Sequence, residues 1–466
     1  MVLVSQGGGM RALNHCGVWI TEAAISGVPM IPLFIFVTSF IAHEGEFTYV
    51  LPFVLFYAFN KMGEFTLGMF GEVNNPYRLA QISAWIVIVG ALVCWFGHLS
   101  IICYDIAGVL IGFGSSIFGT MYRTVKSELL KAGTFPYPHA NLMGFALMTV
   151  FSFAILAAQG RLETIIISVY IIMAVIALLT LQSFDLSDTM KNRSLFQPHT
   201  GDMRYGIPAL LMLLIAFFVR LFKQTAGAAD IIIVMVLVAI ILVVVNQCKR
   251  YLPAQAFNYH GMYYNEVLIM VVLFNVFYYI ASNNIPGVLI INGLQFLGQF
   301  LAMLGASALI RKLGSHNIPR LITLAMIIAL IVFAIPNTIT DCIAVFAIGF
   351  LSQTGDAMVS GTFRHQSQLT DVDQALSSQK TIGTGIVAGQ TILVIVLAMV
   401  SLAVLHNDAL AMSAYAFHIS INHVDTAFMI TRWICSAIIA IQGIIMAIRN
   451  HGTGIAEPRV LGTQSR

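Results

Sequence analysis

The sequence predicts an all-α polytopic membrane protein with fourteen transmembrane helices, and three observations support this fold class. Hydrophobic residues make up 59% of the 466 residues and charged residues only 9%, whereas soluble domains carry about 25% charged residues. Apolar runs of about 20 residues, the length that crosses a bilayer, recur along the whole chain. Lys and Arg concentrate in alternate connections between these runs, which is the pattern expected of cytoplasmic loops.

The predicted spans follow one another with short connections. The first begins at Cys16, and its apolar run to Ile41 is too long for a signal-peptide core. The fourteen runs cover residues 16–40, 49–71, 79–97, 99–122, 139–159, 162–183, 206–223, 229–246, 263–283, 286–311, 318–336, 339–362, 379–405 and 428–448. The longest connections could not house a soluble catalytic domain; they are 184–205, 247–262, 363–378 and 406–427.

The distribution of basic residues predicts the orientation. With both termini cytoplasmic, eighteen of the 23 Lys and Arg residues, Lys126 among them, fall inside and four, Arg432 among them, fall at outer boundaries. We therefore expect a multi-pass protein of the plasma or inner membrane with both termini inside. The net charge of +3 is too small to imply a nucleic-acid partner, and six scattered Cys without a C-x-x-C predict neither disulfides nor a metal site. No cofactor is expected.

The second span and the connection after it carry an unusual set of polar residues, from Asn60 to Arg78. Lys61 and Glu64 lie three residues apart within the apolar run. A charge inside a span costs a few kcal/mol on insertion scales, so it usually faces a partner or a water-filled cavity. A weaker echo of this hairpin occurs at Ser307–Arg320, which suggests a duplicated architecture.

This hairpin resembles the signature Gly-x-Leu-x-Asp-Arg-x-Gly-Arg between spans 2 and 3 of the major facilitator superfamily. Gly68 takes the place of the first Gly, Phe70 of the Leu and Glu72 of the Asp, while Asn75 replaces the second Gly. The Arg pair is missing, with Arg78 as its substitute. The span count is similar to that of the superfamily's fourteen-span drug:proton antiporter branch.

Further motifs agree with this resemblance in part. Gly108-x-x-x-Gly112 in the fourth span and Gly385-x-x-x-Gly389 in the thirteenth resemble the small-residue motifs of the family and are typical of close helix packing. The Arg that the family carries in span 4 is absent, and Asp105 stands near that place. The Gly-Pro-rich antiporter motif of span 5 is also absent.

The resemblance implies two six-helix bundles, residues 1–183 and 263–466, joined by a linker, residues 184–262, that carries two extra spans. It implies rocker-switch alternating access, with substrate bound near the midplane. The connections between spans 2 and 3 and between the corresponding spans of the second half would then gate the transporter. The expected gating residues are Gly68, Glu72, Arg78 and Arg311, with Glu72 bonding a basic residue or a helix N-terminus.

Ionisable residues within spans are the candidates for ion coupling, because coupling requires a group that alternates between a neutral and a charged state. The candidates are Glu22, Lys61, Glu64, Asp105 and Asp356. We expect Lys61 to hold Glu64 ionised and Glu22 to exchange the proton. The alternative is a static Glu22–Lys61 bridge without proton transfer. Glu266, close to the predicted start of its span, is expected at the membrane interface.

Three amides in the tenth span, Asn292, Gln295 and Gln299, fall on one helical face. They either join helices or line a substrate cavity. No Walker loop, Gly-x-Ser-x-Gly or His-Glu-x-x-His motif occurs, so the sequence does not predict an enzyme.

The expected function is secondary transport, namely proton-coupled export of a small amphipathic organic solute. The open alternatives are uptake of a metabolite or siderophore, lipid flipping, and a membrane assembly or regulatory protein that does not transport. The expected partners are the organic solute, protons and membrane lipids, with the chain acting as a monomer or a loose oligomer.

Overall fold

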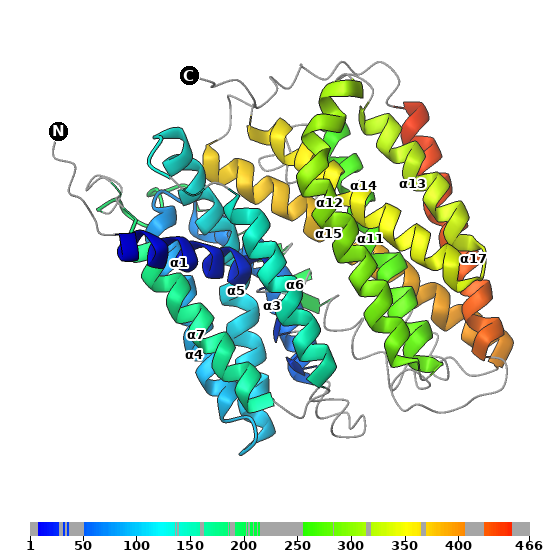
Figure 1. The fold of residues 1–466 in the computed structure, drawn as a ribbon, viewed down its shortest axis with the longest axis horizontal. Coiled ribbons are helices and arrows are strands. Elements are labelled where there is room, and N and C mark those ends of the chain that lie inside the picture. Colours follow the sequence, from blue (N-terminus) through cyan, green and yellow to red (C-terminus); the bar gives the residue numbers. More distant parts are fainter. Residues whose placement is uncertain are drawn as a thin grey trace. The chain divides into compact units, whose positions relative to one another are not determined.

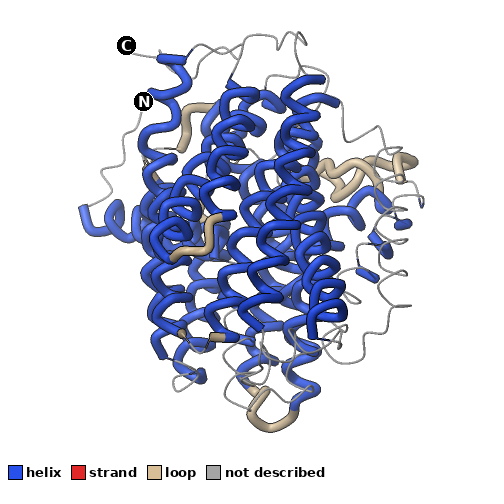
Figure 2. Tube along the Cα trace, turned by 90° about the vertical axis from the view of Figure 1, so that its right-hand side faces the viewer, coloured by secondary structure: helices blue, strands red, loops and turns tan. Residues whose placement is uncertain are grey.

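The computed structural model describes most of the chain, and almost all of the described part is helical (Figure 2). The described residues are 8–27, 31–32, 35–36, 51–135, 137, 139–158, 163–184, 186, 192–201, 203, 206–207, 209–211, 213–214, 255–282, 284–313, 318–364, 370–405 and 424–449. They contain twelve named helices, and the chain divides into two compact units, Met1–Phe218 and Val219–Arg466. The prediction of an all-α polytopic protein is confirmed.

Unit 1 contains the first six of these helices (Figure 1). They are α1 (Gly8–Gly27), α3 (Leu51–Phe70), α4 (Pro76–Trp95), α5 (Ile101–Lys131), α6 (Ala140–Ala158) and α7 (Glu163–Gln182). Helix α5 packs against α3 and α4, while α1 packs against α6 and α7. Because α5 also contacts α1, it can place polar side chains against both neighbours.

Unit 2 contains the other six (Figure 1). They are α11 (Gln255–Ala281), α12 (Ile285–Leu313), α13 (Ile318–Ala334), α14 (Thr338–Arg364), α15 (Asp371–Leu405) and α17 (Val424–Arg449). Helix α11 packs against all five of the others. It is therefore the central helix of this unit.

Eight described helices are long and apolar enough to cross a membrane, and two further apolar helices are shorter. Their outward faces are apolar too: on α4, Ile82, Trp85, Val89 and Leu92 are exposed at helical spacing, as expected for a face that meets lipid. Twelve of the fourteen predicted spans coincide with described helices. The two central spans, 206–223 and 229–246, lie outside the described residues except for a few helical positions between 206 and 214, so fourteen spans remains a prediction.

The small-residue motifs bring helix backbones into direct contact. A methyl group on Gly112 would overlap the carbonyl oxygen of Phe56 on α3, and one on Gly389 would overlap the carbonyl oxygen of Glu266 on α11. The prediction that these glycines serve close helix packing is confirmed. The first contact brings polar residues of α3 against α5, and the second encloses Glu266.

Candidate functional site

A buried ion pair connects three helices of unit 1. The Lys126 ammonium on α5 forms an ion pair with Glu22 Oε1 on α1 and donates a hydrogen bond to Asn141 Oδ1 on α6. Glu22 is 5% exposed and Lys126 is 9% exposed, and the Phe135 ring lies 5.2 Å from the ammonium. Removing a carboxylate from water is costly, and an adjacent ammonium offsets that cost.

The cation that pairs with Glu22 is Lys126 and not Lys61, which the sequence analysis gave as the alternative bridge. Helix α5 continues to Lys131, beyond the predicted end of its span at residue 122. Tyr122, Val125, Lys126 and Leu129 are all buried, at the i, i+3, i+4, i+7 spacing of one helical face. This periodicity was the available signal, and hydropathy missed it because charged residues interrupt the apolar run.

Helix α3 meets α5 through two hydrogen bonds between side chains. Thr120 Oγ1 donates to Glu64 Oε1 at 2.8 Å, and Asn60 Nδ2 donates to Ser115 Oγ at 2.9 Å. The Lys61 ammonium lies 5.6 Å from the centre of the Tyr57 ring. Together with Lys126, these contacts form a polar row along α5 that extends about 16 Å.

In unit 2, two acids take part in the polar contacts of helix α11. They are Asp356, a predicted coupling residue, and Glu266, a residue of α11 itself. Asn265 Nδ2 donates to Asp356 Oδ1 of α14 at 2.8 Å, and Gln442 Nε2 of α17 donates to Glu266 Oε2 at 2.9 Å. Glu266 is only 2% exposed, so the expectation that it lies at the interface is wrong. Helix α11 begins at Gln255, well before the predicted start of its span, which places Glu266 near the middle of the helix.

The predicted amide stripe of α12 is buried at its first two positions. Asn292 Nδ2 donates to the Val288 carbonyl of its own helix at 2.8 Å. Gln295 is buried, and its Oε1 has no hydrogen-bond partner among the described residues, while Gln299 is half-buried. Asp105 lies in the second turn of α5, half-buried, with Oδ1 likewise unpartnered within the described part. A role for these residues in substrate binding or coupling remains a prediction.

The connection between α3 and α4 is held by a segment that follows α7, residues 192–201, which we call the strap. The backbone N–H groups of Asn74 and Asn75 donate to the Leu195 carbonyl at 2.9 and 3.3 Å. Asn75 Nδ2 donates to the Arg193 carbonyl at 3.0 Å, and Val73 forms an isolated antiparallel bridge with Phe196. The sequence analysis did not identify the strap, because nothing local marks a loop that pairs with another loop.

The predicted gating residues take different places around this connection. Gly68 lies in the last turn of α3, and Glu72 uses its main chain: its N–H donates to Thr200 Oγ1 at 2.8 Å and its carbonyl accepts from Gln197. Arg78 is exposed, and its N–H donates to Asn75 Oδ1, which caps α4. The side chain of Arg311 lies outside the described part.

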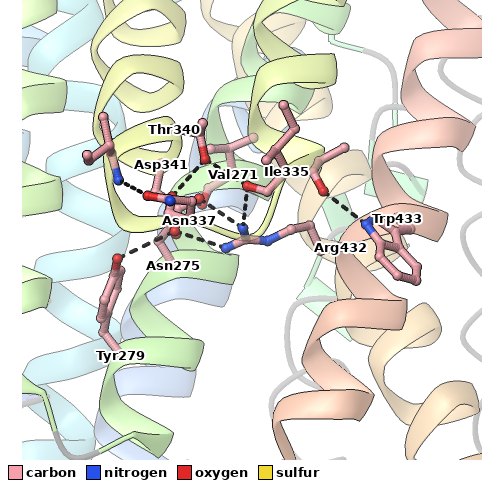
Figure 3. Close-up of polar contacts among 11 residues, drawn as sticks. Val271, Asn275, Tyr279, Ile335, Asn337, Thr340, Asp341, Arg432 and Trp433 are labelled. Atoms are coloured by element: carbon pink, nitrogen blue, oxygen red, sulfur yellow. Dashed lines mark hydrogen bonds and ion pairs between the residues drawn. The ribbon is translucent and has the colours of Figure 1, made fainter.

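A second buried ion pair lies in unit 2, between α14 and α17 (Figure 3). The Arg432 guanidinium contacts Asp341 Oδ1 at 3.0 Å and donates to Asp341 Oδ2 at 3.0 Å. It also donates to the Ile335 carbonyl at 3.3 Å and lies 5.0 and 4.7 Å from the ring centres of Phe274 and Phe333. Arg432 is thus buried within unit 2, beside the connection between α13 and α14.

Within the described residues, no three His, Cys, Asp or Glu side chains lie close enough together to hold a metal ion. The chemistry that the two units offer is therefore that of buried charges and hydrogen bonds. Protonation of a carboxylate is the simplest event that these groups could perform.

Comparisons with known proteins find similarity in structure only. No protein-family model and no curated protein matches the sequence. Among solved structures, the chain is similar to a variant of the nucleoside transporter NupG, with 12% identity over 93% of this chain and 99% of the other and a TM-score of 0.57. It is similar to a variant of the peptide transporter POT in complex with alafosfalin, with 13% identity over 96% and 95% and a TM-score of 0.55.

A third similar structure is a variant of the E. coli fucose:proton symporter FucP, with 12% identity over 94% of this chain and 98% of the other and a TM-score of 0.52. All three are transporters of the major facilitator type. At such low identity the likeness speaks for the fold alone. The chain is a multi-pass membrane protein with the fold of major facilitator transporters.

Proposed function

We propose that this protein is a secondary active transporter that moves a small organic solute by alternating access, driven by protons. The observation that carries the proposal is the buried Glu22–Lys126 ion pair between α1 and α5, in a chain of this fold. Proteins with similar structures are named as nucleoside, fucose:proton and peptide transporters. Because these proteins are named for different solutes, the similarity supports solute transport in general and does not identify the solute.

The finer proposal follows the sequence analysis. The chain would belong to the fourteen-span branch, with six-helix bundles at 1–183 and 263–466, two extra spans within 184–262 and both termini cytoplasmic. Its solute would be a small amphipathic molecule that is exported. The Gly68–Arg78 connection and Arg311 would gate access, and Asn292, Gln295 and Gln299 would contact the solute.

Protonation of Glu22 would change the contact between α1 and α5. A neutral Glu22 no longer attracts the Lys126 ammonium, which keeps its hydrogen bond to Asn141 on α6. The free energy that favoured the α1–α5 contact would thereby fall, and the two helices could separate. Lys61 and Glu64 lie on α3 next to α5, where their charges would change the electrostatic potential near the Glu22–Lys126 pair.

The test uses purified protein in liposomes with an imposed pH gradient and a panel of nucleosides, sugars, dipeptides and amphipathic amines. We expect gradient-driven flux of at least one class. In Glu22→Gln we expect that flux to fall at least tenfold while solute exchange at equal pH persists, since exchange needs no net proton transfer. Asp425→Asn, at an exposed position, is the matched control and should leave both unchanged.

Two results would contradict the proposal. If wild-type protein moves no solute in the panel, the chain is better explained as an assembly or regulatory protein. If Glu22→Gln keeps the pH dependence and lowers only the melting temperature, the Glu22–Lys126 pair is a static bridge.

A further inference from the structure

Glu266 is a buried carboxylate for which the described residues provide no cation. It lies near the middle of α11, is 2% exposed, and accepts one hydrogen bond, from Gln442 Nε2 of α17 at 2.9 Å. No Lys, Arg or His in the described part of the chain forms an ion pair or hydrogen bond with it. In this respect it differs from Glu22 and Asp341, each of which is paired with a cation.

A buried hydroxyl beside this carboxylate also has no partner. Tyr263, one turn before Glu266 on α11, is 0% exposed, and its hydroxyl makes no hydrogen bond with a described residue. That hydroxyl lies against Gly443, the neighbour of Gln442 on α17. On the third side, Gly389 of α15 packs against the Glu266 backbone. We call Glu266, Tyr263 and Gln442 the α11–α17 carboxyl site.

The cations on the neighbouring helices lie at a distance along their helix axes. Arg432 contacts Asp341 and Phe274, and Phe274 is about 12 Å along α11 from Glu266. Lys380 is about 13 Å along α15 from Gly389. Arg320 is about 10 Å along α13 from Ile327, the residue of that helix nearest Gly443.

The other titratable groups that pack near α11 have partners elsewhere. Asp356 of α14 accepts from Asn265, and His260 contacts Thr323 of α13. Tyr264 donates to the Pro319 carbonyl, and Tyr279 donates to Asp341. On α12 and at the end of α17, the basic side chains fall outside the described part. The described groups that we can place beside Glu266 are thus the Gln442 amide, the Tyr263 phenol and the backbone of Gly389.

We propose that the α11–α17 carboxyl site binds a proton, so that Glu266 is a neutral acid when the site is closed and releases its proton when the site is hydrated. Removing a carboxylate from water is costly, and among the described residues no counter-ion offsets that cost at Glu266, so a bound proton would reduce it. The Gln442 amide can donate to either form. The Tyr263 hydroxyl, which has no hydrogen-bond partner among the described residues, would form a hydrogen bond with water when the site opens. The role of this site in coupling rests on the proposed function, whereas its ability to bind a proton does not.

The direct test is infrared spectroscopy of purified protein in lipid, titrated with pH in the absence of solute. We expect the carbonyl stretch of a protonated carboxylic acid at neutral pH, lost in Glu266→Gln and kept in Glu22→Gln and Asp425→Asn. In Gln442→Leu, loss of the amide donor should move the titration midpoint up by about one pH unit, because that bond favours the charged form. If Glu266→Gln does not fold, the shift of the titration midpoint in Gln442→Leu is the measurement that tests the assignment.

The assignment is overturned if wild-type protein shows no such stretch, if the stretch survives in Glu266→Gln, or if it responds to sodium and not to pH. For coupling, Glu266→Gln in liposomes should lose pH-driven accumulation and retain exchange at equal pH. A wild-type protein that moves no solute, yet shows the Glu266 stretch, would defeat the proposed function and leave the proton site standing. Unchanged pH-driven accumulation in Glu266→Gln would overturn the coupling role.

Discussion

The buried ion pairs of the two units, Glu22–Lys126 and Asp341–Arg432, differ in how the cation meets the carboxylate, at one oxygen of Glu22 and at both oxygens of Asp341. The Arg432 guanidinium contacts both oxygens of Asp341, a backbone carbonyl and two aromatic faces. The contacts of the Lys126 ammonium include one oxygen of Glu22, the amide oxygen of Asn141 and the Phe135 ring. Arg suits the first arrangement because its planar fork binds two oxygens at once and always stays charged.

This difference distinguishes two kinds of ion pair. We call a pair that fixes two helices together a clamp, and a pair that one proton can open a switch. Asp341 lies in the first turn of α14, where the helix dipole also favours its negative charge. Several contacts must break together before Arg432 moves, so we infer that this pair fixes the α13–α14 connection to α17. A single proton on Glu22 removes the main contact of Lys126. Burial of an ion pair therefore does not by itself indicate coupling; the geometry with which the cation meets the carboxylate decides.

The largest expected effect is that of Arg432→Met. It leaves Asp341 buried without its cation, and we expect a loss of about 3–5 kcal/mol in the free energy of unfolding. Thermal unfolding in detergent measures the loss. The double variant Asp341→Leu with Arg432→Met should recover most of it, since replacing both charges by apolar groups is often neutral. An unchanged melting temperature in the single variant would remove the distinction between clamp and switch.

Lys126→Met should be less damaging, with a loss of about 1–3 kcal/mol in the free energy of unfolding, because Lys126 contacts one oxygen of its carboxylate rather than two and a proton can neutralise Glu22. The same unfolding assay, run beside Arg432→Met, gives the comparison. We also expect solute flux to become insensitive to the pH gradient. A loss of stability as large as that of Arg432→Met, with normal pH-driven flux, would show that the two pairs play the same structural part.

Asn75→Ala extends the comparison to a connection that is held without charges. Asn75 caps α4 and binds the strap, and removing a cap costs about 0.5–2 kcal/mol. We expect faster amide hydrogen exchange at residues 71–75 and 193–197, with little change elsewhere. Arg78→Ala, at an exposed side chain, is the control. Equal exchange in the two variants would mean that the strap does not hold this connection.

Much of the fold could be predicted because apolar runs are a local property of the sequence. Twelve predicted spans coincide with described helices, and the small-residue motifs lie where helix backbones touch. Helix ends were less accurate: α5 and α11 extend well beyond their apolar runs. Lys126 and Glu266 lie near the ends of the predicted apolar runs, 99–122 and 263–283, and for this reason their burial was missed.

The sequence by itself determined that the chain must cross a membrane many times, since so apolar a composition cannot stay in water. It also determined that Glu22 would need a partner, because an unpaired charge inside a span is costly. Only the tertiary structure decided which partner that is. Glu22 and Lys126 are 104 residues apart, and Asp341 and Arg432 are 91 apart. Helix packing brings such residues together, and no local pattern of residues encodes that packing.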